Sequence, residues 1–187
     1  MIKELEFDPV SLLVTLPVTV RLADLEKWLN QKGYTFGFCP RRLQKGLTLR
    51  EALERRIPNR WSLRYGELDE ICMAVEVQTP LGLVRTKRVP RSATGPDLKR
   101  IWIGSGRTYG SLLKATFRIV PIPEMRRLVR IPHRRAKGAR PVGNFLRKVL
   151  ASGIRPAAIE RNGRGLKIHL EGMKEIVSAE MKTVQKL

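Results

Sequence analysis

The chain has 187 residues, of which 42% are hydrophobic and 29% are charged. This composition is typical of a soluble globular protein and argues against extended disorder. Lysine and arginine (37) outnumber aspartate and glutamate (17), so the formal net charge is +20. Such a charge favours anionic partners: a nucleic acid, an acidic protein subunit, an anionic lipid or a phosphate-bearing cofactor.

Membrane and metal classes receive little support from the sequence. No run of about 18 apolar residues exists, so no membrane span is predicted. The mixed, charged N-terminus lacks the apolar core of a signal peptide, and we therefore expect a cytoplasmic protein. The histidines and cysteines lie in unrelated contexts, which predicts neither a metal site nor a disulfide: Cys39, Cys72, His133 and His169.

The first two thirds of the chain predict an α+β unit with an antiparallel sheet. Residues 12–20 are apolar and β-branched but contain Pro17, which favours an edge strand. Residues 22–29 have helical spacing of leucine and tryptophan. Thr48 and Glu51 have the spacing of a capping box, so a short helix is expected to begin there.

Three further segments have the pattern of strands. Residues 72–79 and 83–87 flank a Pro-Leu-Gly turn and predict a hairpin. In residues 111–120, alternation predicts inward side chains at Leu113, Ala115 and Phe117. The unit predicted from these elements covers residues 1–124.

Residues 125–141 are predicted to be a basic linker, because the stretch up to residue 143 contains seven arginines or lysines and no acid. Three interpretations stay open for it: a solvated linker, a docking segment for an acidic partner, or a nucleic-acid contact. A small second module is predicted at residues 142–187. It consists of a helix, a hairpin around an Asn-Gly turn, and a final amphipathic helix.

Five short motifs occur in a fixed order along the first unit. They are SLRYG at 62–66, EVQTPLG at 76–82, GPDL at 95–98, IGSGRTYG at 103–110 and PIPE at 121–124. In order and spacing they resemble the larger FAD-binding subdomain of the vanillyl-alcohol-oxidase (PCMH) type, as found in glycolate oxidases and D-lactate dehydrogenases. Residues 152–160 are similar to the start of that family's substrate-side cap domain.

The resemblance implies a fold and a set of cofactor contacts. Ser62, Tyr65 and Gly66 would lie along FAD, and glycine there permits a close approach of the backbone. The strand at Val75 and Val77 would offer backbone groups near the adenine. The resemblance extends to Gly104 and Gly106, whose segment lies in the family beneath the flavin.

The glycine cluster has two interpretations. Gly104, Gly106 and Gly110 lack the spacing of a dinucleotide fingerprint and precede a strand, so no helix N-terminus would face a phosphate. A structural turn is therefore the favoured interpretation, with a cofactor contact as the other. No catalytic residue is predicted, and the adjacent Asp69 and Glu70 are expected to be exposed, solubilising charges.

The chain departs from the family pattern in three respects. About 13 residues stand where the family has a pyrophosphate-binding subdomain, Arg50-Glu51 replaces a glycine pair, and the cap domain is short. We therefore expect FAD binding that is weak or dependent on a partner. One hypothesis is a shortened FAD-linked oxidoreductase subunit, of the 2-hydroxy-acid oxidase type, whose flavin site is completed by another, acidic subunit. The other is a flavin-free scaffold whose basic surface binds an acidic protein or, less readily, a nucleic acid.

Overall fold

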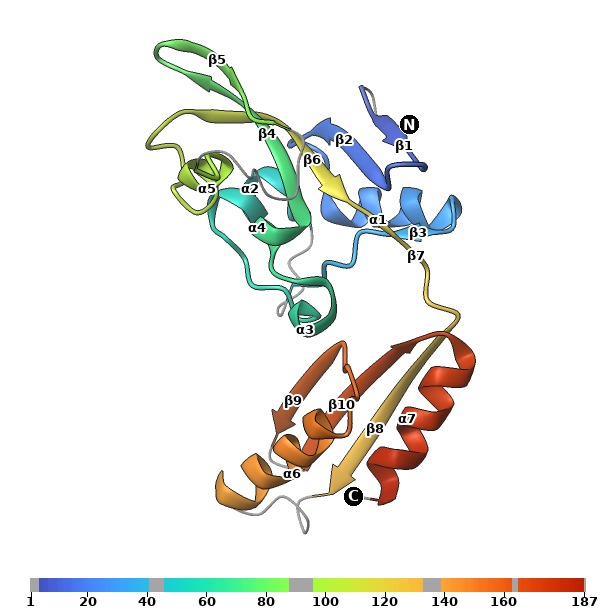
Figure 1. The fold of residues 1–187 in the computed structure, drawn as a ribbon. Coiled ribbons are helices and arrows are strands. Elements are labelled where there is room, and N and C mark those ends of the chain that lie inside the picture. The colour runs from blue at the N-terminus through green and yellow to red at the C-terminus, as the bar shows by residue number, and fades with distance from the viewer. Residues whose placement is uncertain (1–3, 41–45, 88–95, 133–138, 163–164, 187) are drawn as a thin grey trace. The chain divides into compact units, whose positions relative to one another are not determined.

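The computed structural model of the protein describes residues 4–40, 46–87, 96–132, 139–162 and 165–186. By its internal contacts the chain divides into two compact units (Figure 1). Unit 1 holds Met1–Arg60 and Gly66–Ile122, and unit 2 holds Trp61–Tyr65 and Pro123–Leu187. The short segment Trp61–Tyr65 thus belongs with the C-terminal part of the chain, although it lies between two stretches of unit 1.

Unit 1 is built on a five-stranded sheet in which every neighbouring pair is antiparallel. In spatial order its strands are β1 (Glu6–Asp8), β2 (Leu13–Pro17), β6 (Ser111–Arg118), β4 (Cys72–Thr79) and β5 (Gly82–Arg85). A separate two-stranded ladder joins β3 (Tyr34–Thr35) to β7 (Val120–Pro121). The hairpin of β4 and β5 and the strand β6 confirm three sequence predictions.

Alternation along the strands gives this sheet one apolar face and one polar face. On β2, Val14 and Leu16 are buried among apolar residues, while Thr15 between them points to the other face. Opposite β2, Phe117 of β6 is paired with Val14 and Thr116 with Thr15. The apolar face is therefore continuous across neighbouring strands.

Four helices supply the other half of the core of unit 1. They are α1 (Leu22–Gln31), α2 (Leu49–Glu54), α4 (Leu68–Ile71) and α5 (Lys99–Trp102). Each buries at least one large apolar side chain, as Leu25 and Leu29 of α1 illustrate. The predicted capping box of α2 is confirmed, because the Thr48 hydroxyl accepts from the Glu51 amide and the Glu51 carboxylate accepts from the Thr48 amide.

Unit 2 contains a three-stranded antiparallel sheet in the order β8 (Met125–Pro132), β10 (Gly165–Gly172) and β9 (Ala158–Asn162). Helices α6 (Ala139–Ala151) and α7 (Lys174–Lys186) share one core with one face of this sheet. The core is formed by residues such as Val129, Ile168, Phe145 and Val177. The short helix α3 (Ser62–Tyr65) also belongs to this unit and contacts β9.

The α+β class with antiparallel sheets and flanking helices is confirmed. The helix–hairpin–helix description of the C-terminal module is not confirmed, because β8 adds a third strand to the hairpin of β9 and β10. β8 occupies Met125–Pro132, where a basic linker was predicted, and it buries Val129 and Ile131 while its arginines point outward. Residues 133–138 of that predicted linker lie outside the described residues.

Two predictions about strands of unit 1 were wrong in detail. β2 is an interior strand, because β1 pairs along its outer side, and Pro17 stands only at its last position. On β6, Leu112 is 1% exposed and Leu113 is half-buried. The register between β4 and β6 shifts between Glu76 and Val77, and this irregularity brings Leu112 opposite Val77.

Candidate functional site

A cavity of about 340 Å³ lies on the polar face of the sheet of unit 1. All five strands of the sheet and Thr86, the residue after β5, contribute to its lining, which comprises Glu6, Thr15, Ala74, Val75, Glu76, Arg85, Thr86, Lys114 and Thr116. The hydroxyls of Thr15 and Thr116 lie 2.9 Å apart, and both side chains are buried. The cavity therefore offers hydroxyl and carboxylate groups on a rigid strand scaffold.

Three of the charged residues in the lining, Glu76, Arg85 and Lys114, are engaged in ion pairs. Arg85 Nε lies 2.9 Å from Glu76 Oε2 across the β4–β5 hairpin. Lys114 Nζ lies 3.0 Å from Glu4 Oε2, and the hydrogen bond to that carboxylate raises the pKa of Lys114. A ligand with a single strong charge would have to compete with these pairs, so the lining favours a polar ligand of low net charge at this place.

Val75, one of the predicted cofactor-binding residues, lines this cavity, and Val77 follows it on β4. The amide of Val75 donates to the Thr86 hydroxyl at 2.9 Å, and the carbonyl of Val75 accepts from the Thr86 amide at 3.0 Å. Val77 is paired with Val84 in the same hairpin. Val75 is thus brought to the cavity with its amide and carbonyl already bonded to Thr86, whereas Val77 is buried and is not part of the lining.

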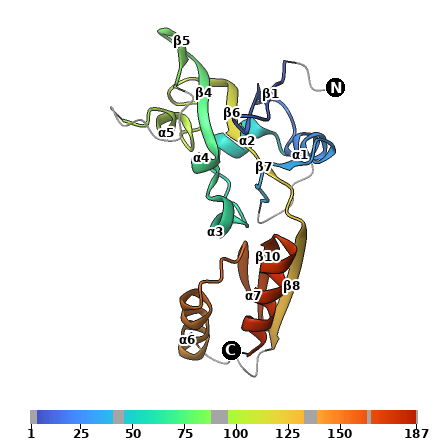
Figure 2. The ribbon, with the colours of Figure 1, turned by 45° about the vertical axis from the view of Figure 1, so that its right-hand side comes forward.

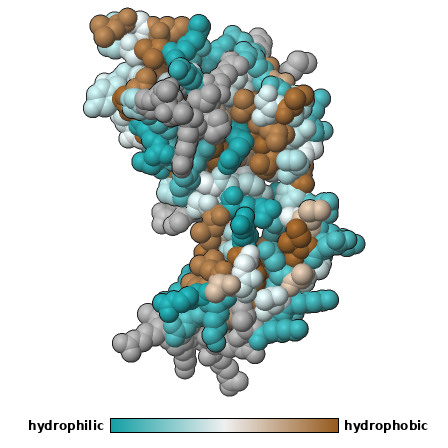
Figure 3. All heavy atoms as spheres, in the orientation of Figure 1, coloured by the Kyte–Doolittle hydropathy of each residue, from teal (hydrophilic) through white to brown (hydrophobic). Residues whose placement is uncertain are grey.

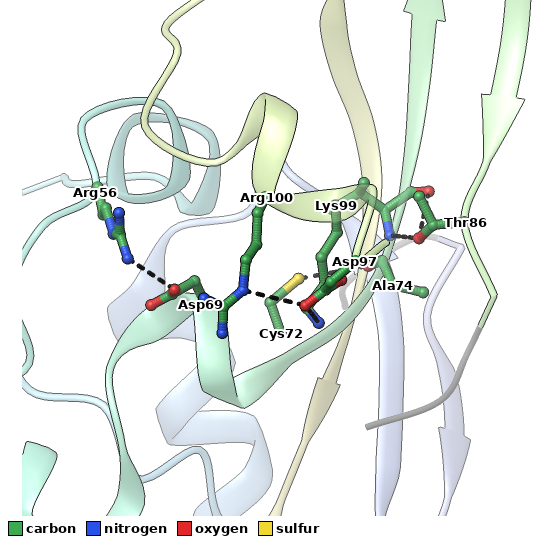
Figure 4. A network of polar contacts seen from close by, with 9 residues as sticks. Arg56, Asp69, Cys72, Ala74, Thr86, Asp97, Lys99 and Arg100 are labelled. Atoms are coloured by element: carbon green, nitrogen blue, oxygen red, sulfur yellow. Dashed lines mark hydrogen bonds and ion pairs between the residues drawn. The ribbon is translucent and has the colours of Figure 1, made fainter. Parts of the chain in front are cut away.

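A buried polar network lies beside β4 (Figure 4). Lys99 Nζ lies 2.6 Å from Asp97 Oδ2, and Arg100 Nε lies 3.2 Å from the same oxygen. Burial acts to raise the pKa of Asp97, but the hydrogen bond and the charge of Lys99 outweigh it, and the net pKa is lowered. Burial raises the pKa of the Cys72 thiol to about 12, so this thiol is inert at neutral pH.

Asp69 was expected to be an exposed charge, and that prediction was wrong. Its side chain is 5% exposed and accepts from Arg56 Nη2 at 2.8 Å (Figure 4). The sequence signal that was missed is the second capping box, in which Glu67 and Glu70 begin α4 and place Asp69, between them, in its first turn. Asp69 is therefore a structural ion-pair partner of the loop after α2.

The predicted residues Ser62 and Tyr65 lie at the two ends of α3, in unit 2, whereas Gly66 belongs to unit 1. Gly66 has φ +89°, and a Cβ on it would come within 3.2 Å of the Glu70 Cβ and 2.7 Å of its carboxylate. Its carbonyl accepts from the Asn59 side chain at 2.8 Å. The structure therefore separates the three predicted residues between the two units.

Within unit 2, Tyr65 is anchored near a buried carboxylate. The Glu171 side chain is 4% exposed, and its oxygens lie 3.1 Å from Arg126 Nε and 4.0 Å from Arg64 Nε. Burial and a hydrogen bond with Glu171 raise the pKa of Tyr65. Arg126 also stacks over the Trp61 ring, with 5.3 Å between the guanidinium carbon and the ring centroid. This cluster holds the segment Trp61–Tyr65 on the sheet of unit 2.

The two remaining predicted residues have backbone roles near α2. The amide of Gly104 donates to the carbonyl of Leu53 at 2.9 Å, and the amide of Gly106 donates to the carbonyl of Glu54 at 3.2 Å. These bonds satisfy carbonyls at the C-terminal end of α2. The arrangement supports the structural-turn interpretation, and a cofactor contact at these glycines stays a prediction.

The described residues contain no group of three or more histidine, cysteine, aspartate or glutamate side chains that could hold a metal ion. None of the helices in the described part of the chain is both long enough and apolar enough to cross a membrane.

Comparisons with known proteins show what this chain is similar to. No protein-family profile matches the chain. Among curated proteins, an alkyldihydroxyacetonephosphate synthase of Caenorhabditis elegans is 29% identical over 136 residues, covering 72% of this chain and 22% of the synthase. The uncharacterized FAD-linked oxidoreductase YgcU of Escherichia coli K12 is 29% identical over 82% of the chain and 31% of its own length. A mitochondrial D-lactate dehydrogenase (cytochrome) of Arabidopsis thaliana is 30% identical, and the match covers 54% of this chain and 18% of the dehydrogenase.

In sequence, this chain is similar to FAD-linked oxidoreductases and to D-lactate dehydrogenases. The predicted family resemblance is thereby confirmed over part of the family's length, since the chain spans about a fifth of the synthases it matches. A solved structure of an alkyldihydroxyacetonephosphate synthase superimposes on all of this chain with a TM-score of 0.81. It is 18% identical, and the chain covers 39% of it, so this match shows a shared fold.

Proposed function

We propose that this protein is a shortened flavoprotein-type subunit, which acts on a 2-hydroxy acid together with partner chains that complete the flavin site. The observation that carries the proposal is the relationship to a FAD-linked oxidoreductase and to D-lactate dehydrogenases over more than half of the chain. The matches cover about a fifth to a third of those proteins.

The residues of unit 1 fit one end of a dinucleotide. The cavity of about 340 Å³ lies near the lower end of the range of about 300–1,000 Å³ for small-molecule sites. Its lining of three threonines around Val75 suits a polar ring that exchanges hydrogen bonds with hydroxyls. A cofactor of that length would extend beyond this cavity, toward walls supplied by another chain.

The chain's own residues would bind and orient the cofactor. Thr15, Thr86 and Thr116 would exchange hydrogen bonds with it, and the paired charges of Arg85 and Lys114 would define the rim. When bound, FAD supplies the chemistry of accepting a hydride from the substrate carbon. Because no catalytic acid or base is assigned in the described residues, groups that hold or move the proton would come from the partner.

A tagged copy expressed in the native host tests the proposal. The copy is purified with its bound proteins, which are identified by mass spectrometry, and the visible absorbance of the complex is recorded. Flavin absorbance in a complex with a second polypeptide supports the proposal. Absence of flavin both in that complex and in the isolated chain rejects a cofactor role.

A second candidate function is a flavin-free binding module with the same fold. The net charge of +20 and the internal hydrogen bonds of the Val75 backbone with Thr86 favour it. Such a module would use its basic surface to bind an acidic protein or a nucleic acid. Fluorescence anisotropy with labelled RNA and DNA over a salt series tests whether the module binds nucleic acid. Absence of binding at low salt excludes this function.

A further inference from the structure

The sheet of unit 2 has an apolar face and a polar face. Val129 and Ile131 of β8 and Ile168 of β10 turn to one face, where they share an apolar cluster with α6 and α7. Helix α7 lies along β8 and β10 (Figure 2). The residues that alternate with them turn to the opposite face. This polar face of unit 2 holds Arg126, Leu128 and Arg130 of β8, Lys167, His169 and Glu171 of β10, and Glu160 of β9.

One end of the polar face of unit 2 is covered by residues of the same unit. Arg126 stacks over the Trp61 ring, and its Nε lies 3.1 Å from Glu171 Oε2. Arg64 Nε lies 4.0 Å from the other carboxylate oxygen of Glu171. Helix α3, which carries Arg64, also contacts β9. The segment Trp61–Tyr65 therefore forms a wall at this end of the face.

Beyond this wall, two basic side chains lie beside each other. Lys167 and Arg130 are directly opposite in the register of β10 and β8, and like charges at such positions destabilise an antiparallel pair. The partner of Lys167 on β9 is Glu160, but the Glu160 carboxylate lies 3.7 Å from His169 Nε2. Within the described residues, neither Lys167 nor Arg130 makes an ion pair.

The position of Lys167 in the sheet holds this pair in place. Lys167 belongs to the middle strand, so the described chain supplies both of its neighbouring strands. Ile168 and Leu170 of the same strand are buried in the core, which fixes β10 from the other face. Lys167 is half-buried and Arg130 is exposed. An anion bound between the two side chains would replace their mutual repulsion with two attractive contacts.

The chemistry of the two side chains selects a small oxyanion. A guanidinium offers parallel N–H donors that match a carboxylate or a phosphate, and an ammonium adds a point charge. The carboxylates of Glu160 and Glu171 on the same face would repel the further charges of a polyanion such as a nucleic acid. In the view of Figure 3, hydrophobic and hydrophilic side chains are interspersed, so no extended apolar surface dominates the face shown there.

We propose that Arg130 and Lys167 bind the carboxylate or phosphate group of a small molecule on the polar face of unit 2. Leu128 is 39% exposed and stands directly opposite His169, so it would contact the carbon skeleton of that molecule. The proposal goes beyond the proposed function, because it concerns unit 2 alone and involves no flavin.

The test follows the imidazole signals of the full chain by NMR. His169 reports on the site, because it lies two residues from Lys167 on the same face. The chain has two histidines, so a His133→Gln variant assigns the signals. The protein is titrated at constant ionic strength with inorganic phosphate, with D-lactate and with D-lactamide. The first two distinguish a phosphate site from a carboxylate site, and the third is the neutral analogue of lactate.

Matched variants separate the site from the general positive charge. Lys167→Gln and Arg130→Gln should each weaken binding by at least about tenfold, whereas Lys167→Arg, which keeps the charge, should retain it. Lys182→Gln on α7 and Arg147→Gln on α6 remove the same charges from the helices that pack on the apolar face. These two changes should alter the affinity by less than about twofold.

Saturable shifts of the His169 signal that are weakened in both site variants support the proposal, and the tighter of the two anions shows which group the site takes. Three results overturn it: no saturable shift with either anion, equal binding of D-lactamide and D-lactate, or equal losses in the control and site variants. If Lys167→Gln fails to fold, as judged by circular dichroism, Arg130→Gln decides alone, because it changes an exposed residue.

Discussion

The ammonium group of Lys99 lies 2.6 Å from the carboxylate of Asp97, although the lysine side chain is only 4% exposed. A buried ammonium without a counter-charge is strongly disfavoured, and the carboxylate of Asp97 supplies that counter-charge inside unit 1. Asp97 belongs to one of the family-like motifs, GPDL at 95–98, and Lys99 directly follows that motif. The motif therefore has a structural role that is independent of any cofactor.

Replacing Asp97 with asparagine should destabilise unit 1. We expect a loss of about 2–3 kcal/mol, somewhat less than for a fully buried pair because Asp97 is partly exposed. Urea unfolding followed by circular dichroism measures the change. Arg100→Gln removes the exposed partner of the same carboxylate and should cost less than about 1 kcal/mol. Equal losses in the two variants would show that burial of Lys99 is not the cause.

The carboxyl group of Asp97 also makes the free energy of unfolding depend on pH. Its pKa is lowered in the folded protein from an ordinary value of 3.8, so it contributes stability above that value and loses the contribution as the pH falls through the folded pKa. Wild-type protein should therefore approach the stability of Asp97→Asn below about pH 3.8 and exceed it at neutral pH. Parallel urea titrations of both proteins over this range check the convergence. A constant difference at all pH values would contradict it.

Glu171→Gln should loosen the segment Trp61–Tyr65 from unit 2. The glutamine keeps the size of the side chain but weakens the pairing with Arg126 and Arg64, and we expect a cost of about 1–3 kcal/mol. Faster amide exchange in residues 61–65 is the specific readout, because a general loss of stability would affect all of unit 2. Glu175→Gln, an exposed change on α7, should leave that exchange unaltered.

Gly110→Ala tests the turn before β6. Gly110 has φ +137°, and a Cβ there would lie 2.6 Å from the carbonyl oxygen of Gln78 on the neighbouring strand. Since that contact is with backbone, β4 and β6 would have to separate, and the loss should exceed about 2 kcal/mol. Gly106→Ala meets nothing within 4 Å and should cost only about 1–2 kcal/mol from its positive φ. Thermal unfolding of the two variants decides between them.

The sequence was sufficient to predict the elements whose apolar residues follow a clear period. Alternation in residues 72–79 and 111–120 corresponds to β4 and β6, and the spacing of Thr48 and Glu51 corresponds to the α2 capping box. These signals are local, so they depend little on the rest of the fold. The exact inward residue, Leu112, depended on a register shift between strands, which no single segment encodes.

The contacts around the predicted site residues join segments that are distant in the sequence. Glu171 meets Arg64 and Arg126 because three separate segments converge in unit 2, and charge density alone could not show it. β8 was predicted to be part of a linker because its arginines dominated the composition. The alternation of Val129 and Ile131 with exposed residues was the signal that could have identified a strand.

Retention of FAD by the purified chain tests the central claim most directly. The chain is mixed with FAD, passed through gel filtration, and its absorbance is compared with that of the complex isolated from the native host. We expect no retained flavin for the chain alone and stoichiometric flavin for the complex. Stoichiometric FAD on the isolated chain would contradict the claim that a partner completes the site.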